Sequence, residues 1–213
     1  MGKLKLQISV SLDGFVAGPN QSEEHPLGEG GEQLHDWVVA LAAWRGPHGR
    51  EGGEVNASTP VFEEATANVG ASIMGRNMFG GGPGPWAEDP WQGWWGDEPP
   101  FHHPVFVLTH HEREPLELEG GTSFIFITDG IESALAQARE AAAGKDVAIG
   151  GGAEAIQQYL AAGLVDEMLL NVIPILLGDG ARLFGSPGAG FDLEQVEVIE
   201  APGVAHLRYR ASA

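Results

Sequence analysis

The chain has 213 residues and a formal net charge of −19 at pH 7, which suits one α/β domain with a sizeable core and disfavours nucleic acid and anionic membranes as partners. It contains no cysteine, so disulfides, thiolate metal sites and a cysteine nucleophile are excluded. The first residues run into an alternating pattern and not into a long apolar stretch. We therefore expect no signal peptide and no membrane span, and a cytoplasmic protein.

The N-terminal part of the chain predicts a strand followed by a helix. Residues 3–12 alternate between apolar and polar side chains, which indicates a strand with one apolar face, and residues 15–17 continue it after a break. Apolar residues then recur at helical spacing from Glu32 to Ala42, before the glycine-rich residues 46–53. This spacing predicts one amphipathic helix.

The next segment predicts a helix, a strand and a long insertion. Thr59 as cap and Pro60 at the first helical position indicate a helix that closes at Gly70, and residues 71–74 read as a buried strand. Residues 80–100 are rich in Gly, Pro and Trp without periodicity, which is typical of a long loop. The sequence leaves three alternatives open for its tryptophans: they pack over the sheet, contribute to an oligomer interface or line a substrate pocket.

Strands and helices alternate through the rest of the chain. Asp129 as cap and Glu132 three residues later predict a helix to about Ala143, and a further helix closes at Gly163. We predict strands at residues 105–109, 123–128, 147–149 and 167–173, and a terminal hairpin at 193–200 and 204–210. The expected fold is a three-layer α/β domain over residues 1–213, with a central, mostly parallel mixed sheet flanked by helices and a C-terminal antiparallel hairpin.

The sharpest local feature is the run Gly150-Gly151-Gly152, which lies between a predicted strand and a helix that opens at Ala153. Glycine lets the backbone approach a ligand closely, and a helix N-terminus attracts phosphate. The run therefore indicates a cofactor phosphate site, with a tight turn that needs positive φ as the alternative. A Rossmann fingerprint is disfavoured, because the run comes late in the chain and no acidic residue ends the next strand.

Two other strand ends carry donors for anions. Gly75-Arg76-Asn77 follows a predicted strand, and the planar guanidinium of Arg76 suits a phosphate, although a surface arginine is the alternative. Thr109 and His110 end another strand, close to a further histidine and an arginine, and this cluster suits a second phosphate.

The paired histidines His102-His103 and His110-His111 also allow a metal site. Adjacent residues on an extended chain point in opposite directions, and no HExxH spacing is present, so we predict no metal site. The sequence also lacks a G-x-S-x-G elbow and a Walker loop, so acyl and phosphoryl transfer lose support.

Acid/base candidates are few. Asp13 ends the first strand, and Glu32 and Asp36 lie on the first predicted helix. The alternative for Asp13 is a turn-forming residue, and for the other two a solvated helix face.

Taken together, the chain resembles the dihydrofolate reductase-like superfamily, and more closely the C-terminal reductase domain of the bacterial bifunctional riboflavin-biosynthesis deaminase-reductase. The resemblance rests on short segments in the same order along nearly the whole chain: ISVSLDGF at 8–15, MGRNMF at 74–79, VFVLT at 105–109, IGGG at 149–152, and VDE at 165–167 leading to PILLGDG at 174–180.

The resemblance implies a sheet of about eight or nine strands, NADPH as hydride donor and a homodimer. It also implies that the cofactor is lined by Gly75, Arg76, Asn77, Thr109, His110, Gly150, Gly151, Gly152 and Ala153. Arg76, together with His110 or Arg113, would bind the adenosine 2′-phosphate and so select NADPH over NADH. The acidic residue that binds the pteridine in dihydrofolate reductases aligns only loosely with Glu32 or Asp36.

The resulting hypothesis is an NADPH-dependent oxidoreductase that transfers hydride to a small heterocycle, most like a 5-amino-6-(5-phosphoribosylamino)uracil reductase or a pterin reductase. Asp13 and Asp36 are its candidate catalytic residues, for polar contacts with the substrate. The alternatives are an NADP(H)-binding dimeric scaffold without turnover and a metal-dependent enzyme built on the paired histidines.

Overall fold

A computed structural model describes residues 2–185 and 192–211 of the chain. The chain forms two compact units: unit 1 comprises Val69–Val165 with the first residues up to Leu6, and unit 2 comprises Gln7–Asn68 and the residues from Asp166 on. Among the described residues, no helix has the length and apolarity that a membrane crossing requires.

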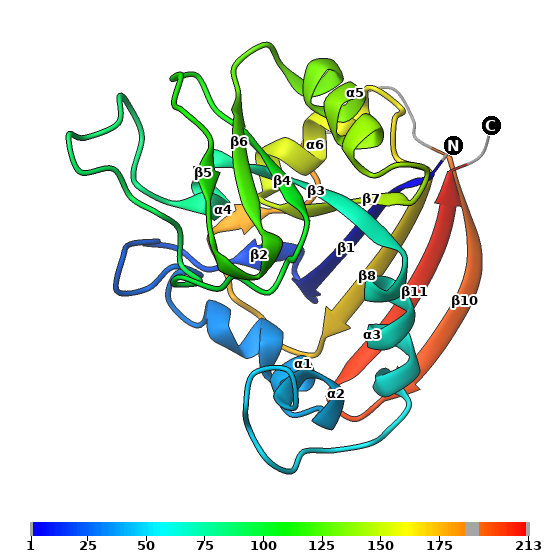
Figure 1. The fold of residues 1–213 in the computed structure, drawn as a ribbon. Helices are drawn as coiled ribbons and strands as arrows, with labels where there is room; N and C mark the ends of the chain where they lie inside the picture. The colour runs from blue at the N-terminus through cyan, green and yellow to red at the C-terminus, as the bar shows by residue number, and fades with distance from the viewer. Residues whose placement is uncertain (1, 186–191, 212–213) are drawn as a thin grey trace. The chain divides into compact units, whose positions relative to one another are not determined.

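Nine strands form one mixed sheet in the order β10-β11-β8-β1-β7-β3-β4-β6-β5, and β2 and β9 form a separate antiparallel pair (Figure 1). The strands are β1 (Leu4–Ser11), β2 (Phe15–Ala17), β3 (Val69–Gly75), β4 (Pro104–Leu108), β5 (Leu116–Glu117), β6 (Ser123–Ile127), β7 (Asp146–Gly151), β8 (Glu167–Ile173), β9 (Ala181–Arg182), β10 (Leu193–Ala201) and β11 (Val204–Ala211). Strands β1, β7, β3, β4 and β6 pair in parallel, whereas β10, β11 and β8 pair antiparallel. The predicted mostly parallel sheet with a C-terminal hairpin is confirmed.

Unit 1 has helices against its parallel strands. Helix α5 (Ile131–Ala141) packs on β3, β4 and β7, and α6 (Ala153–Ala161) packs on β7 and β3. The central residues of β3 are all buried, as expected for a parallel strand covered on both faces. The buried Tyr159 donates its hydroxyl to the Ile131 carbonyl at 2.9 Å and so joins α6 to the start of α5.

The predicted cap of α5 is wrong. Gly130, with φ 95°, precedes the helix, and no side chain in the described part of the chain caps it. Instead, the Asp129 carboxylate accepts hydrogen bonds from the hydroxyls of Thr128 at 3.2 Å and Ser133 at 3.3 Å. A short side chain that bonds a neighbouring hydroxyl is not available to the backbone amides of the first turn.

An aromatic cluster fills one side of unit 1. Its buried members are Met74, Phe79, Val105, Val107 and Phe124. The side chains that pack on them, partly buried, are Met78, Trp86, Trp91, Trp95, Phe101, Leu116, Leu118 and Phe126. Three of the four tryptophans of residues 80–100 therefore pack over the sheet, which was one of the alternatives that the sequence left open.

In unit 2 the single helix predicted between Glu32 and Ala42 is wrong. The chain forms a 3₁₀ helix (Gly31–His35) and two short helices, α1 (Asp36–Val39) and α2 (Ala42–Arg45). Leu41 is extended, with φ −71° and ψ 138°, because the backbone on either side of it pairs with Glu54 through hydrogen bonds of 2.9 and 2.8 Å. This bridge interrupts the helical pattern.

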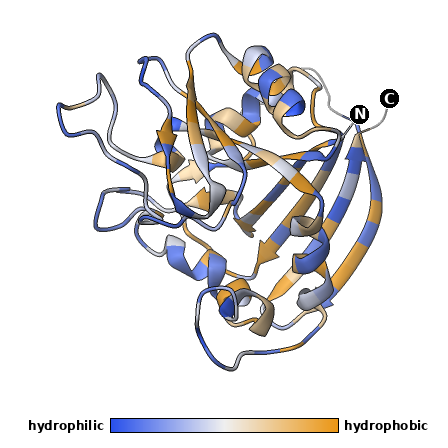
Figure 2. Cartoon of the chain, in the orientation of Figure 1, coloured by the Kyte–Doolittle hydropathy of each residue, from blue (hydrophilic) through white to orange (hydrophobic). Residues whose placement is uncertain are grey.

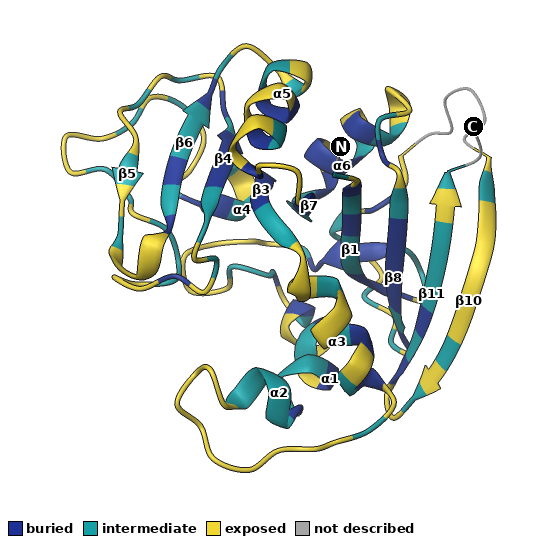
Figure 3. Cartoon of the chain, turned by 45° about the vertical axis from the view of Figure 1, so that its right-hand side comes forward, coloured by how far each residue is buried: buried dark blue, intermediate teal, exposed yellow. Residues whose placement is uncertain are grey.

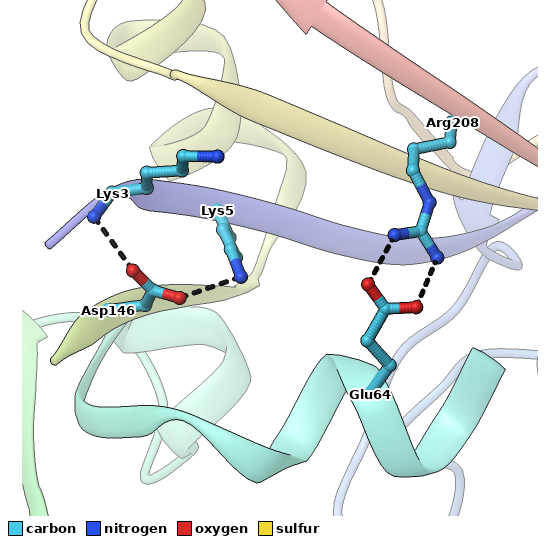
Figure 4. Close-up of polar contacts among 5 residues, drawn as sticks. All are labelled: Lys3, Lys5, Glu64, Asp146 and Arg208. Atoms are coloured by element: carbon cyan, nitrogen blue, oxygen red, sulfur yellow. Dashed lines mark hydrogen bonds and ion pairs between the residues drawn. The ribbon is translucent and has the colours of Figure 1, made fainter. Parts of the chain in front are cut away.

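Helix α3 (Ser58–Ala67) begins one residue before the predicted cap, because the Asn56 side chain accepts the Ser58 amide at 2.9 Å. Two polar contacts join α3 to β11. The Ser58 hydroxyl lies 2.8 Å from His206 Nε2, and the Glu64 carboxylate accepts two hydrogen bonds from Arg208, at 2.7 and 3.0 Å (Figure 4). The side chain of His206 is buried and its Nδ1 atom lies 2.8 Å from Asn171 Oδ1.

The C-terminal hairpin is the outer part of unit 2. Strands β10 and β11 alternate hydrophilic and hydrophobic residues (Figure 2). Buried residues lie on β11, whereas β10 has none. Strand β8 is buried, whereas β10 is exposed along most of its length (Figure 3). Three glutamates on β10 (Glu194, Glu197 and Glu200) add charge to this edge.

The start of the chain is fixed within unit 1 by one carboxylate. Asp146, at the beginning of β7, accepts the backbone amide of Lys3 at 2.9 Å and pairs with the Lys5 ammonium at 2.6 Å (Figure 4). Asp146 is 7% exposed, so this pairing offsets the cost of burying its charge.

Candidate functional site

Three of the predicted turns lie at neighbouring strand ends in unit 1. Strands β7, β3 and β4 are adjacent and parallel, and the register aligns Met74 with Gly151 and Gly75 with Leu108. Their carboxyl ends therefore meet at one edge of the sheet, which is where α/β sheets bind ligands. The structure thus brings Gly150–Gly152, Gly75–Asn77 and Thr109 together, at the positions where the sequence placed cofactor contacts.

The glycine run is partly strand and partly turn. Gly150 and Gly151 end β7, and Gly152 precedes α6. Gly151 has φ 131°, a conformation that favours glycine. A Cβ atom on Gly75 would lie 3.4 Å from the Ala155 side chain and 3.6 Å from the Gly152 nitrogen, whereas one on Gly152 would meet nothing within 4 Å. The two turns are thus in close contact, and there is open space beside Gly152.

The first turn of α6 faces this space without a cap. No side chain of the described residues caps it, and the first hydrogen bond of the helix runs from Ile156 N to the Gly152 carbonyl at 3.2 Å. The amides of Ala153 and Glu154 have no partner inside the helix, because the first amides of any α-helix lack one. Together with the helix dipole they fit a phosphate group.

Arg76 begins the four-residue helix α4 (Arg76–Phe79), directly after β3. Its Nε and Nη2 atoms donate to the carbonyls of Gly80 and Gly81, both at 3.0 Å, and its Nη1 atom lies 3.4 Å from the Thr109 hydroxyl oxygen. The guanidinium therefore fixes the first residues of the loop and reaches the end of β4.

A second arginine lies nearby. The Cζ atom of Arg76 is 3.1 Å from the centroid of the Trp86 ring, and that of Arg113 is 4.7 Å from the same ring. Burial, and then the positive charge of Arg113, lower the pKa of Arg76; burial alone lowers the pKa of Arg113. Within residues 2–185 and 192–211, no carboxylate pairs with either guanidinium. Two half-buried cations without a counter-ion fit an anionic ligand.

The remaining predicted cofactor contacts differ in exposure. Thr109 is 8% exposed, and its hydroxyl oxygen also accepts the amide of His111 at 3.2 Å. His110 and Asn77 are exposed, so both are free to turn toward a ligand. Ala153 is buried as the first residue of α6, so its backbone amide and not its methyl group is the candidate contact with a ligand.

The loop of residues 80–100, called the tryptophan loop below, is bonded to the end of α4 through indole N–H groups. Trp94 donates to the Met78 carbonyl at 3.0 Å and Trp91 to the Phe79 carbonyl at 2.8 Å. Trp86 donates to the His111 carbonyl at 3.0 Å. Sequence reasoning did not assign Trp86 to the site. The available signal was the density of tryptophan in a loop that begins directly after α4, the short helix that Arg76 starts.

The two candidate catalytic residues lie in unit 2. Asp13 accepts hydrogen bonds from the Ser11 hydroxyl at 2.6 Å and from the amides of Leu177 at 3.2 Å and Gly178 at 2.7 Å. These contacts, led by Ser11, lower its pKa. The carboxylate of Asp13 therefore anchors the loop after β8. Asp36 is exposed at the first residue of α1, and its side chain makes no hydrogen bond within the described residues.

The paired histidines have separate partners. His103 Nε2 lies 2.8 Å from the Ser72 hydroxyl, and burial lowers the pKa of His103 to about 4. His102 Nδ1 lies 2.9 Å from the Gly120 carbonyl oxygen. In the part of the chain that the structure describes, no group of three or more His, Cys, Asp or Glu side chains is arranged to hold a metal ion.

The order of the strands and the turns at the carboxyl ends of β7, β3 and β4 are those of a dihydrofolate reductase-like fold. A dihydrofolate reductase from Enterococcus faecalis, complexed with NADP(H), matches with a TM-score of 0.54 and 15% identity over 100% of this chain and 98% of that one. A putative riboflavin biosynthesis protein from Shewanella sp. PV-4 matches with a TM-score of 0.63 and 21% identity over 99% of both chains.

The family follows from the sequence comparisons. The model of the RibD C-terminal domain matches residues 2–205. The uncharacterized protein YyaP of Bacillus subtilis (strain 168) is 30% identical over 97% of this chain and 94% of its own length. The chain therefore belongs to the RibD C-terminal domain family. The fold and the family expected from the sequence are both confirmed.

Proposed function

We propose that this protein is an NADPH-dependent reductase that transfers a hydride to a small heterocyclic substrate. The observation that carries the proposal is the meeting of three turns at the carboxyl ends of β7, β3 and β4. One turn has helix amides without a side-chain cap, and near another lie two guanidinium groups that pair with no carboxylate of the described residues. The family and the reductases of the same fold support it. When bound, NADPH supplies the hydride from its nicotinamide ring.

The residues of unit 1 fit the phosphates of such a cofactor. Gly150–Gly152 and the first amides of α6 would hold the pyrophosphate, because a phosphate there meets free amides and open space. Gly75 and Asn77 would line the cofactor beside this turn. Arg76, with Arg113 or the exposed His110, would hold the adenosine 2′-phosphate next to Thr109.

For the substrate we propose a ribosylated aminopyrimidine, as in 5-amino-6-(5-phosphoribosylamino)uracil, or a pterin. Asp36 has an exposed carboxylate without a hydrogen bond in the described structure, which suits a polar contact with such a ring. The Asp13 carboxylate already accepts a hydroxyl and two amides, so we propose that it positions the loop after β8 and is not a proton donor.

Two measurements test the proposal. Titration with NADPH, followed by tryptophan fluorescence, is expected to saturate well below about 1 mM. NADPH oxidation with aminopyrimidine ribosides and pterins is then expected to identify the substrate class. Absence of saturable binding contradicts the proposal, whereas tight binding without oxidation of any substrate favours an NADP(H)-binding scaffold. A homodimer is also proposed, and light scattering would then give twice the chain mass of 22.5 kDa.

A further inference from the structure

The Trp86 ring is fixed by a hydrogen bond and by aromatic contacts, and two arginine side chains lie against it. Its Nε1 atom is bonded to the His111 carbonyl, and the rings of Phe126 and Phe79 contact it edge-on, with centroid distances of 5.1 and 5.9 Å. The guanidinium groups of Arg76 and Arg113 lie 3.1 and 4.7 Å from its centroid. Because the face of an indole attracts cations, this one ring offsets the mutual repulsion of the two arginines.

The ring also fixes the orientation of Arg76. A guanidinium has five N–H donors in one plane. In Arg76 the Nε and Nη2 donors are directed at the carbonyls of Gly80 and Gly81, while the Nη1 edge faces Thr109 at the end of β4. With its Cζ atom over the Trp86 ring and its Nε and Nη2 atoms bonded to the loop, the guanidinium presents its Nη1 atom in a preset geometry, so little rotamer freedom is lost when an anion binds.

Arg113 is held in the same cluster. Its guanidinium donates to the Trp91 carbonyl and lies 4.8 Å from the Phe126 ring. Glu112 and Glu114 flank it in the sequence, yet within the described residues neither forms an ion pair with it. The cluster therefore concentrates two positive charges on a chain whose net charge is −19. A dianionic phosphate monoester is the ligand chemistry that such a pair fits best.

We propose that Trp86 is a positioning residue that makes the cofactor site selective for a dinucleotide with a 2′-phosphate. It acts through Arg76 and Arg113, which it holds in place for that phosphate. The inference rests on the proposed function, because it concerns the same cofactor site. It predicts that loss of the ring face weakens NADPH binding and leaves NADH binding unchanged, since NADH has no 2′-phosphate.

Four proteins test the proposal: the wild type, Trp86→Leu, Trp86→Phe and the matched control Trp95→Leu. Trp95 lies in the same loop and packs on Phe124 and Phe101, with no cation near its ring in the described structure. Both Trp86 variants lose the hydrogen bond to His111, but only Phe retains an aromatic face. Calorimetry gives the dissociation constants for NADPH, NADH and adenosine 2′,5′-bisphosphate, and circular dichroism confirms that each variant folds.

We expect Trp86→Leu to weaken NADPH and bisphosphate binding about tenfold, which corresponds to about 1.4 kcal/mol, and to leave NADH binding unchanged. Trp86→Phe retains most of the preference, and Trp95→Leu retains all of it. An unchanged NADPH/NADH ratio in Trp86→Leu, or equal losses in the Phe and Leu variants, overturns the inference while the proposed function stands. Wild-type protein that binds neither dinucleotide overturns both.

Discussion

The Nη1 atom of Arg76 lies 3.4 Å from the Thr109 hydroxyl oxygen, and this contact links the turn after β3 to the turn after β4. The two residues come from segments more than thirty positions apart, yet the parallel pairing of β3 with β4 places their ends side by side. Gly75, which precedes Arg76, also lies close to the glycine turn after β7. The positive charge of Arg76 therefore lies beside all three turns of the candidate site.

Replacement of Arg76 should weaken the cofactor site more than it weakens the fold. Arg76→Leu removes a charge-assisted contact to phosphate, and we expect NADPH affinity to fall by about thirtyfold, or about 2 kcal/mol. Some stability is also lost, because the Gly80 and Gly81 carbonyls lose their donor. Calorimetric titration measures the first effect. Arg210→Leu, at an exposed ion pair in unit 2, serves as the control, and an equal loss in both variants would contradict a phosphate role for Arg76.

Asp13→Asn should loosen the loop after β8. The pKa of Asp13 is lowered chiefly by the Ser11 hydroxyl and also by the loop amides, so its stabilising effect is present above the unfolded pKa and lost as the pH falls through the folded value. At neutral pH we expect faster hydrogen exchange at the amides of Leu177 and Gly178 in the variant. Asp179→Asn should leave those two amides slow, because within the described residues the Asp179 side chain accepts just the adjacent Gly180 amide. Unchanged exchange in Asp13→Asn would show that the carboxylate does not hold the loop.

His206 should make unit 2 sensitive to mild acid. Burial, and then the charge of Arg208, lower the pKa of His206 to about 4 from its ordinary 6.5. The folded state therefore resists protonation that the unfolded state accepts, and the stability contribution is lost as the pH falls from about 6.5 to about 4. Between pH 7 and pH 5 the loss is about 2 kcal/mol. Urea unfolding at both pH values measures it.

His206→Gln retains a polar side chain but does not titrate in this range. We expect a smaller difference in unfolding free energy between pH 7 and pH 5 in this variant than in the wild type. The pKa of His103 is lowered in the same direction, so part of the pH dependence remains. An identical pH dependence in both proteins would mean that folding does not lower the pKa of His206.

Asp146→Asn should destabilise unit 1. The carboxylate accepts the Lys3 amide and pairs with the Lys5 ammonium while it is 10% exposed in its side chain. Loss of the carboxylate charge removes its ion pair with the partly buried Lys5 ammonium, and we expect a loss of about 2 kcal/mol in unfolding free energy. Glu194→Gln, which removes an exposed pair with Arg210, should change it by less than about 0.5 kcal/mol. Equal effects in urea unfolding would argue against the anchoring role.

Much of the fold was predictable because its strands are locally specified. Residues 71–74 and 105–109 are apolar and short, and each is followed by a glycine or a polar turn, so the strand ends that carry the site were correctly located. Parallel pairing then brings those ends together, as the family resemblance implied. The two-residue strands β5 and β9 were missed, because so short a segment has no periodicity.

The errors come from contacts between segments distant in the sequence. Leu41 has a helical pattern around it, but pairing of the adjacent backbone with Glu54 keeps it extended. The position of Trp86 against Arg76 depends on how residues 80–100 pack on the sheet. Only tertiary structure determines these contacts, so local pattern did not reveal them.

The central claim is that NADPH binds at the carboxyl ends of β7, β3 and β4, and hydrogen exchange with and without NADPH tests it most directly. We predict that saturating NADPH slows amide exchange at residues 150–155, 75–79 and 109–113, with residues 193–211 of the terminal hairpin as the internal control. Binding of NADPH without protection of the glycine turn at residues 150–155 would contradict the claim.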